Sequence, residues 1–170
     1  ENNSDLAKAE TLLAAFMQDF PPQTADEKAA VARVQANICA KTGDLHDWEK
    51  FKTKAALLPG DQRASLYNNF AWELAEKGEE LEVAKSLSAE AVALAKKEIT
   101  APSSPKPALM TEKSRRQFRT IDYGNYLDTY AYVLDKTGDP VSAARYQAEA
   151  IGLNGGKDAE FNERYVGYLE

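Results

Sequence analysis

The sequence has little of several features that define common classes of protein. It contains one cysteine, Cys39, so no disulfide can form within the chain, and Cys39 on the apolar side of a helix is interpreted as a core thiol. The one histidine, His46, has no cysteine near it at the spacing of a zinc site. No apolar run approaches the roughly 20 residues that a membrane-spanning helix needs. These absences exclude a disulfide scaffold and a membrane span, and they disfavour a metal site.

Basic charge is also scarce, because 21 Lys and Arg stand against 27 Asp and Glu, a formal net charge of -6. Such a chain would repel a nucleic-acid backbone, and we expect no nucleic-acid partner. There is no Gly-x-Gly-x-x-Gly, no phosphate loop, no Gly-x-Ser-x-Gly and no outstanding pair of carboxylates. The sequence therefore predicts no cofactor and no catalytic residues.

The opening of the chain is not expected to be a signal peptide. The opening "ENNSDLAKAE" has neither a basic segment nor a long apolar core, and it also lacks an initiator methionine. A processed protein or a fragment of a longer one would both begin in this way, and the end at Glu170 is open to the same two interpretations.

Helical periodicity is what the sequence does have, and strand-like alternation is nearly absent. Ser4 and Asp61 are predicted N-caps, and Thr24 with Glu27 forms a predicted capping box. Pro140 falls in the first turn of a helix, where its missing N–H is harmless. The predicted helices cover about 4–20, 25–42, 44–58, 61–77, 81–99, 123–137, 140–153 and 157–170.

A short motif repeats along the chain. "KTGD" at 41–44 returns at 136–139, and "EKGE" at 76–79 is a variant of it. In each copy a lysine ends one helix, a glycine makes the turn, and an acidic residue helps to start the next helix. Gly43 and Gly78 are 35 residues apart, and Gly138 follows after one further period plus about 25 residues, which indicates a helix–turn–helix repeat with an insertion.

The repeats resemble the tetratricopeptide family. The resemblance is carried by "LYNNFAWELAEKGEELEVAKSLSAEAVAL", by "NYLDTYAYVLDKTGDPVSAARYQAEAIGL" and, more degenerately, by "AAVARVQANICAKTGDLHDWEKFKTKAALLP". Their shared small residues would let neighbouring helices approach closely. The resemblance implies an all-α fold: a short right-handed superhelical array of antiparallel helix pairs, one domain over 1–170. The expected repeat units are 25–58, 62–97 and 122–154, with an insertion at 99–121 and capping helices at 4–20 and 157–170.

The repeats at 66–94 and 125–153 together also resemble the helical region that accompanies a thioredoxin-like domain in some secreted or periplasmic bacterial proteins. This chain has no Cys-x-x-Cys, so it would contain the helical part alone. The resemblance favours a periplasmic or secreted location over a cytoplasmic one.

Tetratricopeptide arrays bind peptides in a concave groove lined by the first helix of each repeat. Arg33, Asn37 and Asn69 resemble part of a carboxylate clamp, but the third copy lacks the cations that such a clamp needs. Asparagine side chains that bond across helices, and aromatic side chains buried in the core, are the simpler interpretation of this set. The resemblance implies the following groove residues: Arg33, Asn37, Asn68, Asn69, Trp72, Asn125, Asp128, Thr129 and Tyr132.

The insertion carries a basic island on an acidic protein. Lys113, Arg115, Arg116 and Arg119 lie within seven residues, after the Pro-rich "APSSPKP". Arginine clusters can bind acidic or phosphorylated partners. The alternative is a solvated loop whose arginines pair with nearby acidic side chains.

We therefore expect a non-catalytic protein-interaction module that binds a peptide or a partner domain. Two other classes stay open. One is an enzyme or small-molecule binder in which the 99–121 insertion closes over the groove as a lid. The other is a structural domain that associates with itself through an exposed apolar patch.

Overall fold

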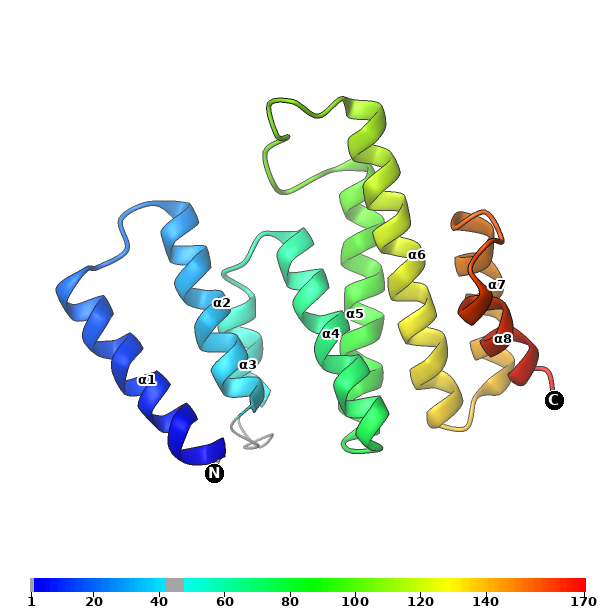
Figure 1. The fold of residues 1–170 in the computed structure, drawn as a ribbon, viewed down its shortest axis with the longest axis horizontal. Coiled ribbons are helices and arrows are strands. Elements are labelled where there is room, and N and C mark those ends of the chain that lie inside the picture. Colours follow the sequence, from blue (N-terminus) through cyan, green and yellow to red (C-terminus); the bar gives the residue numbers. More distant parts are fainter. Residues whose placement is uncertain (1, 42–47) are drawn as a thin grey trace. The chain divides into compact units, whose positions relative to one another are not determined.

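The computed structural model describes residues 2–41 and 48–170 of the chain (Figure 1). All regular structure in this described part is helical, as predicted. The helices are α1 (Asn2–Asp19), α2 (Ala25–Lys41), α3 (Trp48–Ala55), α4 (Gly60–Lys77), α5 (Leu81–Thr100), α6 (Glu112–Lys136), α7 (Pro140–Leu153) and α8 (Ala159–Gly167).

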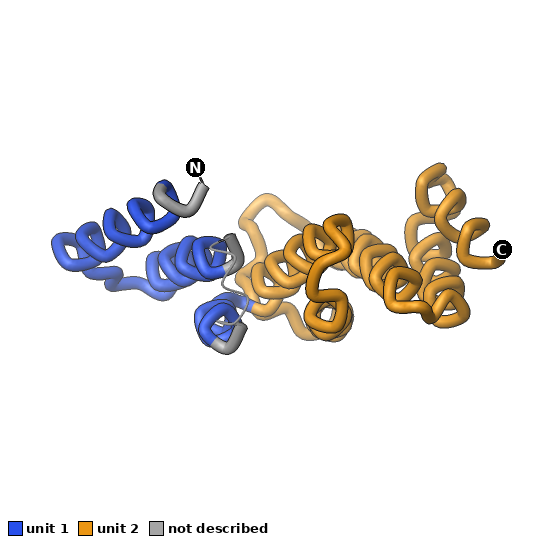
Figure 2. The backbone as a smooth tube through the Cα atoms, turned by 90° about the horizontal axis from the view of Figure 1, so that it is seen from below, with its two compact units in different colours: residues 1–59 blue, residues 60–170 orange. Residues whose placement is uncertain are grey.

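The chain divides into two compact units, residues 1–59 and residues 60–170 (Figure 2). The prediction of one domain over 1–170 stays a prediction.

The first unit contains α1, α2 and α3, and α2 packs against both of the others. The capping box predicted at the start of α2 is confirmed, because the Glu27 N–H donates to Thr24 Oγ1 (3.2 Å) and the Thr24 N–H donates to Glu27 Oε2 (3.0 Å). The predicted turn at Gly43 and helix start at Asp44 lie outside the described residues. Small and apolar side chains are buried along α2 and α3: Ala29, Ala32, Ala36, Ile38, Phe51 and Ala55.

The second unit is built from the helix pairs α4–α5 and α6–α7, with α8 packed on α7 and α6 in contact with α4, α5 and α7. Gly78 and Gly138 close the two pairs with φ of 67° and 82°, the left-handed conformation expected of a glycine after a helix. Six alanines within the pairs are fully buried, so the helices do approach closely where small residues were predicted: Ala71, Ala84, Ala91, Ala131, Ala143 and Ala150.

The irregular part of the predicted 99–121 insertion is shorter than expected. Helix α5 continues to Thr100, and α6 begins at Glu112 with Thr111 as its N-cap, whose side chain accepts the Ser114 N–H (3.0 Å). From there one helix runs without a break to Lys136, so only residues 101–111 form a loop. The predicted start of the next helix at 123 was wrong, because no proline lies between Glu112 and Lys136 to stop the helix.

Candidate functional site

One face of the second unit brings together side chains from α4, α6 and α8. The chain places them four residues apart on each helix, a spacing that puts them on one side: Asn68 and Trp72 on α4, Asp128, Tyr132 and Lys136 on α6, and Arg164 and Tyr168 at α8. We call these seven residues the aromatic face.

Two ring contacts join the helices at the centre of the aromatic face. The rings of Trp72 and Tyr132 lie 4.8 Å apart between centroids, at an angle of 30°. The Arg164 guanidinium carbon is 5.8 Å from the Trp72 ring, and Lys136 Nζ is 5.1 Å from the Tyr132 ring. Trp72, Tyr132 and Arg164 are all half-buried, so each keeps part of its surface open to solvent.

Beneath these rings, Asp128 forms a buried ion pair that the sequence did not predict. Arg164 Nε and Nη2 donate to the two oxygens of Asp128, each at 2.9 Å, and Gln147 Nε2 donates to Asp128 Oδ1 at 2.7 Å. Burial raises the pKa of the Asp128 carboxyl, although the hydrogen bonds from Gln147 and Arg164 and the charge of Arg164 oppose that rise. The bidentate geometry fixes α8 against α6.

The expectation that Asp128 lines an open groove was therefore wrong. Only 5% of the residue is exposed, because the guanidinium of Arg164 and the amide of Gln147 cover its oxygens. Thr129 is also buried, and its hydroxyl donates to the Asn125 carbonyl on the preceding turn (3.4 Å).

Several buried polar atoms near this face have no hydrogen-bond partner in the described part of the chain. They include Asn68 Oδ1 on α4, Gln147 Oε1 on α7 and the Tyr168 hydroxyl. Burial raises the pKa of Tyr168 well above its usual range, and the nearby negative charge of Asp128 adds to the shift. An unpartnered buried polar group costs about 1–3 kcal/mol, and natural proteins tolerate such costs mainly where function requires them.

The other predicted groove residues are dispersed. Asn69 is exposed on α4 and Asn125 is exposed on α6. Arg33 and Asn37 are exposed on α2, in the first unit, so their membership of a common groove with the aromatic face stays a prediction. Of the predicted set, contacts through Arg164 and between the rings join Trp72, Asp128 and Tyr132, and Asn68 lies four residues before Trp72 on the same side of α4.

The predicted basic island separates into two groups. Arg119 Nη2 lies 2.7 Å from Asp61 Oδ2 and 3.8 Å from Glu98 Oε2, and Arg115 donates to the Ser104 carbonyl. Burial of Asp61 opposes its ionisation, but hydrogen bonds from Ser104 and Arg119 together hold its pKa below the usual value. For Arg119 the structure supports the alternative interpretation, in which an arginine pairs with neighbouring acids.

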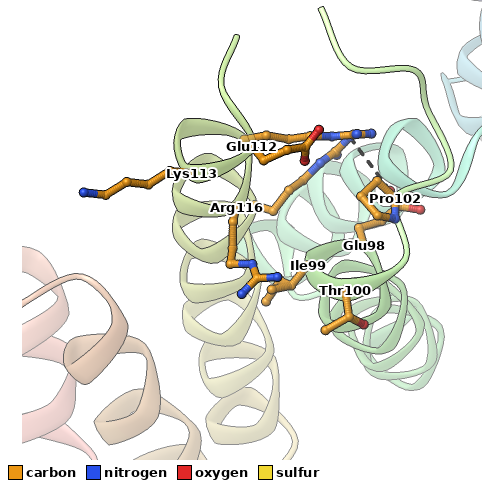
Figure 3. Close-up of a pocket in the computed structure, with 9 residues that line it drawn as sticks. Glu98, Ile99, Thr100, Pro102, Glu112, Lys113 and Arg116 are labelled. Atoms are coloured by element: carbon orange, nitrogen blue, oxygen red, sulfur yellow. Dashed lines mark ion pairs between the residues drawn. The ribbon is translucent and has the colours of Figure 1, made fainter.

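The remaining cations, Lys113 and Arg116, are exposed on α6. Together with Arg115 and Arg119 they line a cavity of about 380 Å³ between the end of α5 and the first turns of α6. Figure 3 shows Glu98, Ile99 and Thr100 on the α5 side, and it shows Lys113 extending away from them.

Sequence reasoning missed Arg164 and Tyr168, which belong to a helix predicted only as a cap. The available signal was their spacing of four residues, which repeats that of Asn68 with Trp72 and of Asp128 with Tyr132. Gln147 gave no signal, since a glutamine within an otherwise apolar helix face has no fixed partner in sequence.

Comparison of the chain with protein-family models, with curated proteins and with solved structures found no match. Among residues 2–41 and 48–170, no three His, Cys, Asp or Glu side chains group in a way that could hold a metal ion. None of the described helices combines the length and the apolar character that crossing a membrane requires, as expected.

Proposed function

We propose that the chain is a non-catalytic protein-interaction module that holds an extended peptide segment of a partner protein on the aromatic face. In this proposal the fold is a short tetratricopeptide-like, right-handed array, with α4–α5 and α6–α7 as two successive repeats and α8 as the cap. The fully buried alanines at repeat-like spacing and the two glycine turns support this assignment.

The observation that carries the proposal is the half-exposed pair of Trp72 and Tyr132, flanked by two cations. Trp, Tyr and Arg are the residues that contribute most to binding energy at protein interfaces. Aromatic side chains provide a large contact area, and here each ring already packs on the other, 4.8 Å apart between centroids. Because the two rings hold each other in place, binding of a peptide would cost little side-chain conformational entropy on this surface.

The chemistry of the face defines the peptide. The Trp72–Tyr132 pair suits an apolar or aromatic anchor side chain, which would stack against the exposed parts of the two rings. The exposed amide of Asn69, three residues before Trp72 on α4, could bond to the peptide backbone. Lys136 would favour an acidic residue next to the anchor.

The proposal is tested by selecting peptides from a random displayed library on the intact chain and measuring their affinities by fluorescence anisotropy. We expect Trp72→Ala and Tyr132→Ala to weaken the selected peptides by at least about tenfold, which corresponds to about 1.4 kcal/mol or more. Phe118→Ala is the matched control, because Phe118 is an exposed aromatic residue of α6 outside the face. Circular dichroism would confirm equal helicity.

Selected peptides that bind all three variants as tightly as the wild type would show that the aromatic face is not the binding surface. If no peptide were selected from the library, the proposed peptide-binding function would be wrong.

The proposal extends to a larger protein context. We propose that the chain works beside a thioredoxin-like domain in a periplasmic or secreted bacterial protein, supported only by the likeness of the two repeats described above.

A lid role for residues 101–111 receives no support, because the Ser104 hydroxyl donates to Asp61 Oδ1 (2.7 Å) and the Ser103 hydroxyl accepts the Gly60 N–H (2.7 Å).

A further inference from the structure

A second, basic groove lies between the N-terminal half of α6 and the turn that joins α7 to α8. Its volume is about 900 Å³, and the residues that define it are Lys113, Arg116, Ile121, Asn125, Leu153 and Lys157. In Figure 1 the first turns of α6 extend past the α7–α8 turn, and the residues that line the groove come from α6, from the end of α7 and from this turn.

The charge of this groove is opposite to that of the chain. Lys113 and Arg116 on α6 and Lys157 on the turn are exposed, in a protein whose net charge is -6. No hydrogen bond or ion pair in the described part of the chain engages these three side chains. The acidic residue at the groove, Asp158, is occupied, because its Oδ1 accepts the Glu160 and Phe161 N–H groups at the start of α8 (3.0 and 3.2 Å).

Two neighbouring arginines explain why Lys113 and Arg116 are unengaged. Arg115 and Arg119 point into the loop and the α4–α5 pair, where Ser104, Asp61 and Glu98 accept or balance their charge. Lys113 and Arg116 border the same α5–α6 cavity as these two arginines, but they also line the basic groove, and neither has an acidic or carbonyl partner in the described part of the chain. The acidic and carbonyl groups nearby are thus paired with Arg115 and Arg119, and the cations Lys113, Arg116 and Lys157 stay exposed to solvent.

The length and lining of the groove indicate what fits in it. From Lys113 to Asn125 the α6 wall spans 12 residues, about 18 Å at 1.5 Å per residue. That length matches about five residues of an extended chain, and it far exceeds a single phosphate or carboxylate group. Ile121 and Leu153 add apolar surface to this lining, and the Asn125 amide, whose Oδ1 accepts a hydrogen bond from Asn154 Nδ2 (3.4 Å), can still donate to a peptide backbone.

We propose that the basic groove binds an acidic segment of a polypeptide, with Asp or Glu side chains near Lys113, Arg116 and Lys157 and one apolar side chain against Ile121 and Leu153. A nucleic acid suits the site less well, because the net charge of the whole chain would repel a long polyanion. This inference stands independently of the aromatic face, which shares none of these residues.

The experiment uses the intact chain and a set of fluorescein-labelled peptides of eight residues. Each peptide carries four Asp or Glu and one Leu, and the Leu occupies a different position in each. Fluorescence anisotropy at low ionic strength gives the dissociation constants, and we expect the tightest peptides to weaken as salt rises.

Charge reversal provides the decisive comparison. The groove variant carries Lys113→Glu, Arg116→Glu and Lys157→Glu; the control carries Lys8→Glu, Lys28→Glu and Lys97→Glu at exposed positions elsewhere, with the same change in net charge. We expect the groove variant to bind at least about tenfold more weakly than the wild type, and the control to differ by less than about threefold. Ile121→Ser should reduce affinity several-fold for peptides with Leu and much less for the same peptides with Ser in its place.

Three outcomes would overturn the proposal. One is that no peptide of the set binds the wild type with a dissociation constant below about 1 mM. Another is an equal loss in the two charge variants, which would mean that net charge alone attracts the peptide. The third is tighter, groove-dependent binding of a single-stranded oligonucleotide of equal charge. The two proposals can fail separately. Tyr132→Ala should weaken only the peptides selected on the aromatic face, and the groove variant should weaken only the acidic peptides.

Discussion

Asp128 and Arg164 show how one pair of residues decides where a helix sits. The pair lies beneath the exposed rings and ties α8 to α6, with Gln147 of α7 as a third member. A charge in this position is tolerated only while its partner is present, because a buried carboxylate without a cation loses its hydration and gains nothing in return. The rigidity of the aromatic face therefore depends on a contact that lies below it.

Replacing Arg164 alone is expected to lower the free energy of unfolding more than replacing Arg164 and Asp128 together. Arg164→Met should lower the free energy of unfolding by about 3 kcal/mol, since it leaves the buried Asp128 carboxyl without its cation. Adding Asp128→Asn should recover most of the loss, because Gln147 can still donate to the new amide oxygen. Urea unfolding of both variants measures the difference. Equal losses in the single and double variants would contradict the proposed coupling.

Titration of the Tyr123 hydroxyl is expected to lower the stability of the second unit at alkaline pH. Burial, with the hydrogen bond that its hydroxyl donates to Glu149 Oε1 (2.9 Å), raises its pKa from 10.0 to about 12. Between these values the unfolded chain releases a proton that the folded chain retains. The contribution of Tyr123 to stability is thus fully present below pH 10 and is lost as pH rises toward 12.

We expect Tyr123→Phe to reduce the fall in stability between pH 9.5 and pH 11.5. Denaturant unfolding at both values measures the change, and Tyr165→Phe on α8 is the matched control. Other buried tyrosines contribute to the same fall, so Tyr123→Phe should remove part of it. An unchanged difference between the two pH values would show that the Tyr123 hydroxyl titrates alike in the folded and unfolded chains.

At the scale of the elements, the loop of residues 101–111 does the work of a helix cap. Helix α4 begins at Gly60 rather than after a cap at Asp61 as predicted, and the Gly60 N–H donates to Ser103 Oγ. The Ser103 N–H in turn donates to Glu98 Oε2 (2.9 Å), which ties the loop to the last turn of α5. Asp61 is free to pair with Arg119 because another residue supplies the cap.

Ser103→Ala is expected to lower the free energy of unfolding by about 1 kcal/mol, as the loss of a helix cap does. Ser86→Ala, at an exposed position within α5, should change it by less than about 0.5 kcal/mol. Thermal unfolding followed by circular dichroism compares the two. If the two alanine variants unfold alike, Ser103 does not act as a cap for α4.

The helix ends that were predicted correctly are those set by neighbours in sequence. Thr24 and Glu27 lie three residues apart, as do Asp139 and Ser142, whose N–H donates to Asp139 Oδ1 (3.0 Å). Such contacts form wherever the chain enters a helix, so their signal is local. The helix pairs and their glycine turns follow from the same local rules.

The contacts that build the candidate site join residues far apart in sequence, and they could not be predicted in this way. Ser103 and Gly60 are separated by 43 residues, Arg164 and Asp128 by 36, and Arg119 and Asp61 by 58. Which of many acids pairs with a given arginine depends on how whole helices pack. Sequence therefore indicated that Trp72 and Tyr132 belong to one surface, but it placed Asp128 on the outside of that surface.

At the scale of the whole molecule, the two proposed binding surfaces belong to one of the two compact units. The aromatic face and the basic groove are built from α4, α6, the α7–α8 turn and α8, all within residues 60–170. This unit contains core clusters of its own: one around Tyr123, Leu127 and Phe161, and another around Leu134, Ala131 and Ala143. All buried residues of these two clusters belong to α5, α6, α7 or α8.

A chain of residues 60–170 alone is therefore expected to fold. The two core clusters around Tyr123 and Leu134 lie within it, and each of its four longest helices packs on at least one other of the same unit. We expect a cooperative urea transition, a helical circular dichroism spectrum, and affinities for the peptides of both surfaces within about threefold of those of the full chain. Loss of the peptides that bind the aromatic face, with the fold retained, would implicate residues 1–59 and return Arg33 and Asn37 to consideration. A broad, non-cooperative transition would instead mean that the second unit needs the first in order to fold.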